Sequence, residues 1–86
     1  MYAVIVSRTF QKQFQKLSSV MKKRVRIGLS ELGEDPFTLR AKADVKVLEG
    51  TDPLKRRLRV GDYRIIFHVE KRTVNVIEIF SRGRGY

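Results

Sequence analysis

Residues 55–67 read KRRLRVGDYRIIF, and this stretch predicts a β-hairpin with one basic face. Polar and apolar side chains alternate in residues 55–60, as in a strand that buries one face. Gly61-Asp62 is a two-residue connection with glycine first, which suits a type II′ turn. Residues 63–70 are then the returning antiparallel strand. Three of the four basic residues of the first strand share one face: Lys55, Arg57 and Arg59.

The sequence before this hairpin predicts one strand and two helices. Residues 2–7 (YAVIVS) are rich in β-branched side chains and predict a short buried strand. Apolar residues recur at helical spacing after Thr9, a predicted N-cap, and again from Ser18 up to Gly33, where the second helix is expected to end. The apolar positions expected to face the core are Phe10, Phe14, Met21, Val25, Leu29 and Leu32.

The remaining segments complete the predicted fold. Residues 36–46 are polar and weakly patterned, so we expect a loop that leads into Val47-Leu48 and a turn. Residues 74–80 carry apolar side chains at both parities, which indicates a central strand. The predicted fold class is α+β: a two-layer β-α-α-β-β-β sandwich with a mainly antiparallel curved sheet and a helical hairpin on one face. We expect residues 1–86 to form a single domain.

The charge of the chain indicates a polyanionic partner. Nineteen Lys and Arg against nine Asp and Glu give a formal charge of +10. Nucleic acid is the first candidate for this partner, and an acidic protein or a membrane surface are the alternatives. Because the sequence has no apolar run of about 18 residues, we expect a cytoplasmic protein that does not span a membrane.

The absence of Cys and the presence of a single His exclude several kinds of chemistry. Disulfides, thiol nucleophiles, cysteine-based metal sites and histidine triads are all impossible within one chain. We therefore expect no metal and no cofactor. Catalysis, if present, must use Lys, Arg, Tyr, Asp or Glu.

Three segments resemble the RelE family of toxin-antitoxin messenger-RNA interferases, particularly its archaeal members. They are VLEG at 47–50, LKRRLRVGDYRIIF at 54–67 and RGRGY at 82–86, and the resemblance spans essentially the whole chain. It implies a toxin that cleaves messenger RNA in the ribosomal A site by attack of a 2′-hydroxyl on the adjacent phosphate. It also implies a RelB-like antitoxin whose helices wrap the toxin in a hetero-oligomer.

The resemblance also implies roles for individual residues. The four predicted catalytic residues are Lys55, Arg64, Arg82 and Tyr86. Arg64 is expected to hold the phosphate and Arg82 to act near the leaving oxygen, whereas either Lys55 or Tyr86 takes the 2′-hydroxyl proton. The residues predicted to bind RNA are Arg57, Arg59 and Arg84. The family often has Lys at the position of Arg57, and a guanidinium cannot serve as a general base.

Two other functions remain open from the sequence. A related toxin that poisons DNA gyrase shares the fold, but such toxins are expected to lack the Lys, Arg and Tyr set. A non-catalytic RNA-binding or ribosome-associated module would carry the same charge without needing Tyr86. For the individual residues, the structural alternatives are that Lys55 is an ordinary surface lysine and that Arg64 pairs with a nearby acid such as Asp62 or Glu49.

Overall fold

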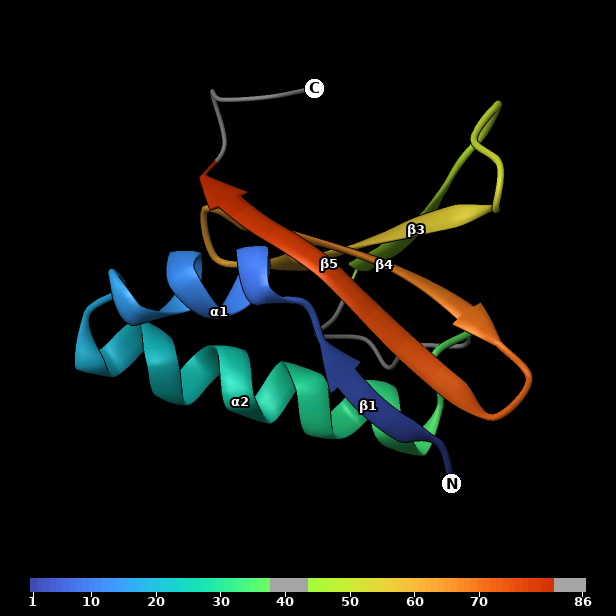
Figure 1. Ribbon diagram of the computed structural model, residues 1–86. Coiled ribbons are helices and arrows are strands. Elements are labelled where there is room, and N and C mark those ends of the chain that lie inside the picture. The colour runs from blue at the N-terminus through green and yellow to red at the C-terminus, as the bar shows by residue number, and fades with distance from the viewer. Residues whose placement is uncertain (38–43, 82–86) are drawn as a thin grey trace.

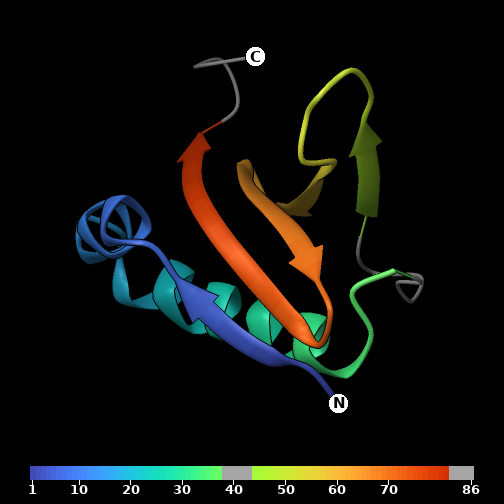
Figure 2. The ribbon, with the colours of Figure 1, turned by 45° about the vertical axis from the view of Figure 1, so that its right-hand side comes forward.

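Two helices pack on one face of a five-stranded sheet in the computed structural model, which describes residues 1–37 and 44–81 (Figure 1). The elements are β1 (Ala3–Val6), α1 (Arg8–Gln15), α2 (Ser19–Glu34), β2 (Asp44–Leu48), β3 (Lys55–Val60), β4 (Tyr63–Glu70) and β5 (Thr73–Ser81). The strand order is β1-β5-β4-β3-β2, with β1 parallel to β5 and every other pair antiparallel. Figure 2 shows the curvature of β4 and β5. The predicted α+β class is confirmed.

The structure adds one strand that the sequence did not predict. β2 covers Asp44–Leu48, where we expected a loop as far as Lys46, so that expectation was wrong for residues 44–46. Residues 38–43 of the expected loop lie outside the described residues. This strand lies at the edge of the sheet and pairs only with β3, with Val45 opposite Leu58. Because a short edge strand is stabilised mainly by its partner strand, its own pattern is weak.

The helix boundaries depart from prediction at two residues. The N-cap of α1 is Ser7, not Thr9, because the Ser7 hydroxyl accepts the N–H of Phe10 at 3.0 Å. Ser18 caps α2 as predicted. Gly33 does not end α2, which runs on to Glu34. A Cβ at residue 33 would lie 3.3 Å from the Val4 side chain, so this glycine allows α2 to approach β1 closely.

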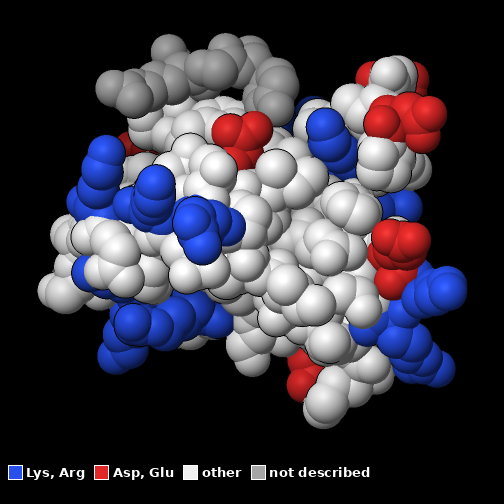
Figure 3. Space-filling view, viewed as in Figure 1, with Lys and Arg blue, Asp and Glu red and all other residues white. Residues whose placement is uncertain are grey.

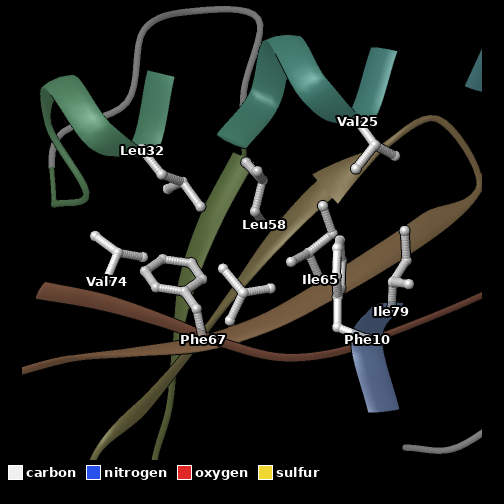
Figure 4. Packing of buried hydrophobic residues seen from close by; sticks show 9 residues of the cluster. Phe10, Val25, Leu32, Leu58, Ile65, Phe67, Val74 and Ile79 are labelled. Atoms are coloured by element: carbon white, nitrogen blue, oxygen red, sulfur yellow. The ribbon is translucent and has the colours of Figure 1, made fainter. Parts of the chain in front are cut away.

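The hydrophobic core lies between the helices and the sheet (Figure 4). Its buried residues come from both layers and are Phe10, Val25, Leu32, Leu58, Ile65, Phe67, Val74, Val76 and Ile79. The other predicted core positions are half-buried and pack against this cluster: Phe14, Met21 and Leu29. The helical stripes therefore face the sheet, as their spacing predicted.

Helix α1 also holds the second half of β5 in place. β1 pairs with β5 only from Thr73 to Val76. Beyond that point the Ser7 hydroxyl donates to the carbonyl of Ile77, and the Gln13 side-chain oxygen accepts the N–H of Ile79 at 2.7 Å. These bonds satisfy backbone groups that a strand edge would otherwise leave unpaired. They fix the path of β5 towards Ser81, its last residue.

Candidate active site

The helix-free face of the sheet presents alternate residues of β3. Leu58 belongs to the helix-covered core, so the residues on either side of it point to the opposite face. Basic residues occupy every second position there: Lys55, Arg57 and Arg59. Lys55 and Arg57 are half-buried, whereas Arg59 is exposed. The basic face that the sequence predicted is therefore present.

Arg64 of β4 lies directly opposite Arg59. One terminal nitrogen of its guanidinium donates to the carbonyl oxygen of Tyr63 at 3.4 Å. A phosphate matches the geometry of guanidinium donors, so this end of the hairpin is a candidate phosphate site. The structure thus brings two of the predicted site residues together.

The next row of the same face consists of Arg57, Ile66 and Glu78, one residue from each of three neighbouring strands. Ile66 is only 1% exposed, although it is outside the core cluster under the helices. The Nε of Arg57 is buried and has no hydrogen-bond partner in the part of the chain that the structure describes. A buried donor without an acceptor costs about 1–3 kcal/mol. A phosphate oxygen would supply that acceptor.

Lys55 lies at the other end of this basic row. Its backbone N–H is held by the Thr51 hydroxyl at 2.9 Å, and that hydroxyl donates to the carbonyl of Leu48 at 2.7 Å. The loop between β2 and β3 thus fixes the start of β3. Lys55 and Arg59 are four positions apart, which corresponds to about 13 Å along a strand. The structure therefore does not bring Lys55 and Arg64 into direct contact through their backbones; they mark the two ends of an extended site.

The remaining predicted residues lie outside the described part of the chain: Arg82, Arg84 and Tyr86. The described part of β5 ends at Ser81, which pairs with Tyr63, and Phe80 pairs with Arg64. The last described residue is thus beside the Arg59–Arg64 end of the site.

Sequence reasoning missed two charged residues on this face. Lys46 lies opposite Arg57 and was hidden because β2 was expected to be a loop. Glu78 lies opposite Ile66 and is half-buried, within a strand read only as apolar on both faces. Alternation in DVKVL at 44–48 was the one signal for Lys46. For Glu78 the signal was a single carboxylate inside an apolar strand.

The described residues favour chemistry that relies on guanidinium groups. Guanidinium groups bind phosphate oxygens and stabilise the charge that develops on a phosphorane.

Within residues 1–37 and 44–81, no three His, Cys, Asp or Glu side chains are placed to hold a metal ion. In the same ranges, neither helix is long and apolar enough to cross a membrane.

A protein-family model matches residues 4–86, and its description is "ParE toxin of type II toxin-antitoxin system, parDE". The match spans nearly the whole sheet and both helices. No curated protein matches the sequence.

Three solved structures are similar over almost the full length. A chain of the archaeal RelE-RelB complex from Pyrococcus horikoshii OT3 is 31% identical, with a TM-score of 0.83 and 98% of both chains covered. A chain of the RelB-RelE complex from Methanococcus jannaschii is 25% identical, with a TM-score of 0.74, covering 92% of this chain and 91% of that one. The isolated E. coli RelE toxin is 25% identical, with a TM-score of 0.73, covering 99% and 88%. The chain therefore belongs to the RelE/ParE superfamily of type II toxin-antitoxin toxins and is related to RelE.

Proposed function

We propose that this toxin is a metal-independent endoribonuclease that cleaves messenger RNA in the ribosomal A site, in the cytoplasm, and so inhibits translation. The observation that carries the proposal is the opposed pair Arg59 and Arg64, continued along β3 by Arg57 and Lys55. These four cations form an extended track, which follows β3 for about 13 Å from Lys55 to Arg59. An RNA strand offers phosphates along such a track, whereas a small anion would occupy only one end.

The proposed reaction is an internal transfer of the phosphate. The 2′-oxygen attacks the adjacent phosphorus, the bond from phosphorus to the 5′-oxygen breaks, and the products are a 2′,3′-cyclic phosphate and a 5′-hydroxyl. Arg64 and Arg59 hold the phosphate and stabilise the phosphorane, while Arg57 adds a donor from its buried Nε. Lys55 or Tyr86 takes the proton of the 2′-hydroxyl, and Arg82 acts near the departing 5′-oxygen, as the resemblance implies.

A RelB-like antitoxin is the proposed partner that restrains this activity. Two of the similar structures are complexes of RelE with RelB. The net charge of +10 favours an acidic partner by long-range attraction, which speeds association. We therefore propose a toxin-antitoxin hetero-oligomer, whose assembly should slow as the salt concentration rises.

Poisoning of DNA gyrase is the alternative function, because the matching family model is named after ParE. A protein that only binds gyrase needs no buried guanidinium donor and no pair of arginines opposed across a hairpin. The Arg57 and Arg64 environments therefore favour the nuclease.

A message with one 2′-deoxynucleotide at the cleavage position tests the proposal on programmed ribosomes. We expect the all-ribose message to be cut and the deoxy message to stay intact, because the nucleophile is missing. Equal cleavage of both would show attack by water and contradict the mechanism. Intact messages together with gyrase-dependent breaks in DNA would assign the ParE-like function, and intact messages without DNA breaks would leave a non-catalytic binding module.

A further inference from the structure

A cavity lies where the C-terminal end of α1 meets the start of β4 and the end of β5. Figure 1 shows α1 beside the last part of β5, and in Figure 3 cations follow α1 on this side of the molecule. The residues that line the cavity come from all three elements: Gln13, Lys16, Leu17, Tyr63, Phe80 and Ser81. Its volume of about 440 Å³ is within the range of about 300–1,000 Å³ that is typical of pockets for small molecules.

The cavity borders the candidate phosphate site at Arg64. Phe80 is directly opposite Arg64 on the neighbouring strand, and the next pair along the two strands is Tyr63 with Ser81. Phe80, Tyr63 and Ser81 all line the cavity. Because only a ribose separates the base of a nucleotide from its phosphate, a phosphate at Arg64 would bring a base within reach of the cavity.

The polar groups of the cavity are mainly hydrogen-bond donors. The side-chain oxygen of Gln13 accepts the backbone N–H of Ile79 at 2.7 Å, which fixes the orientation of the amide. The amide nitrogen can only donate, and it makes no hydrogen bond within residues 1–37 and 44–81. The Lys16 ammonium is a second group that can only donate. A ligand of this cavity should therefore present acceptors.

The other walls of the cavity favour a base over a second phosphate. Leu17, Tyr63 and Phe80 are apolar or aromatic, which suits a flat ring that stacks. The C-terminal end of a helix carries a partial negative charge, which disfavours an anion. Uracil and guanine present a keto oxygen where cytosine and adenine present an amino group. An amino group would face the donors of Gln13 and Lys16 and leave them without an acceptor.

We propose that this cavity binds a base of the message next to the scissile phosphate and favours uracil and guanine over cytosine and adenine. Gln13 is then a specificity-determining residue, because its amide nitrogen donates to the keto oxygen while its bond to Ile79 keeps that nitrogen in place. Lys16 supplies a second donor. The proposal rests on the proposed function, because it takes the bound strand to be the message.

The test exchanges the donor of Gln13 for an acceptor. Gln13→Glu keeps an oxygen for the N–H of Ile79 but replaces the amide nitrogen by a second oxygen. Gln15→Glu is the matched control, since it makes the same charge change at an exposed position of α1 outside the cavity. The affinity of each protein for single-stranded pentamers of deoxyuridine and of deoxycytidine is measured at low salt. These strands lack the 2′-hydroxyl, so the proposed reaction cannot cut them.

The ratio of the two affinities is the readout, because added negative charge weakens the binding of both strands alike. We expect wild type and Gln15→Glu to bind the deoxyuridine strand about threefold to tenfold more tightly than the deoxycytidine strand, which is the effect of one hydrogen bond. Gln13→Glu should lose or reverse this preference, because a carboxylate accepts from the amino group of cytosine. Equal binding of the two strands by wild type, or an unchanged preference in Gln13→Glu, would overturn the proposal.

A second pair of variants covers the case in which circular dichroism shows that Gln13→Glu is unfolded. Lys16→Met removes a donor of the cavity, whereas Lys12→Met removes the same charge from an exposed position of α1 outside it. Only Lys16→Met should reduce the preference for deoxyuridine, and equal preferences in the two variants would overturn the proposal. Failure of the nuclease itself would appear in cleavage of the all-ribose message, which the binding experiment does not use, so the two failures are distinguishable.

Discussion

The helix-covered and helix-free faces of the sheet are formed by the same strands, but the buried side chains on the two faces have different neighbours. Ile65 and Ile66 are neighbours in β4, with 0% and 1% of their surfaces exposed. Ile65 belongs to the cluster of apolar residues beneath the helices. Ile66 lies between Arg57 and Glu78 on the other face. The helix-covered face stabilises the fold. The helix-free face combines a buried apolar side chain with charged neighbours, as a site for a charged substrate requires.

Replacing Ile65 or Ile66 by alanine measures how much each face contributes to stability. These two substitutions have the largest expected effects on the free energy of unfolding. Ile65→Ala should lower the free energy of unfolding by about 3–4 kcal/mol, because the tightly packed cluster leaves a cavity. Ile66→Ala should cost about 1–2 kcal/mol, because the long side chains of Arg57 and Glu78 can move into the space. Denaturation in urea gives both values. A larger loss for Ile66→Ala would mean that the helix-free face carries the main core.

The link between α1 and β5 offers a second comparison. Gln13→Ala removes the acceptor of the Ile79 N–H and should cost about 1–2 kcal/mol. Gln11→Ala removes only an exposed bond of 3.4 Å to the carbonyl of Val6 and should cost less than about 0.5 kcal/mol. Urea denaturation of the two variants measures both losses in the free energy of unfolding. Equal effects would show that α1 does not secure the end of β5.

The buried Nε of Arg57 predicts a smaller change of opposite sign. Arg57→Met keeps much of the apolar stem and removes a buried donor that has no partner among residues 1–37 and 44–81, so we expect stability to rise by about 1 kcal/mol while cleavage slows. Arg59→Met, at an exposed position, should change stability by less than about 0.5 kcal/mol. Loss of stability in Arg57→Met would show that this guanidinium serves the fold and not the substrate.

Local patterns were sufficient to predict much of this fold. Residues 55–67 predicted their own hairpin because alternation and the Gly61-Asp62 turn agree, and Gly61 has the positive φ of 59° that the turn requires. β2 was missed because it is a short edge strand that depends on pairing with β3, so its own residues show only a weak pattern. Ser7 was missed as the cap because its hydroxyl also contacts β5, a tertiary contact that no local pattern records.

The candidate site was predictable only in part. Alternation placed Arg57 and Arg59 of β3 on one face, but net charge did not locate the site, because α1 and α2 also carry cations. Pairing of Arg59 with Arg64 followed from the hairpin, whereas the row that includes Glu78 depends on the register of β4 and β5 and its bulge after Ile66. The roles of all the predicted site residues stay predictions: Lys55, Arg57, Arg59, Arg64, Arg82, Arg84 and Tyr86.

The most direct test of the central claim is the rate at which Arg64→Ala cleaves ribosome-bound message in a single turnover at saturating protein. Arg64 is proposed to hold the scissile phosphate, so its loss should slow cleavage by about a hundredfold or more, by analogy with the loss of an oxyanion-hole donor. Lys71→Ala, at the exposed turn between β4 and β5, should cleave at the wild-type rate. A folded Arg64→Ala protein that cleaves as fast as wild type would contradict the account and move the active site away from the helix-free face.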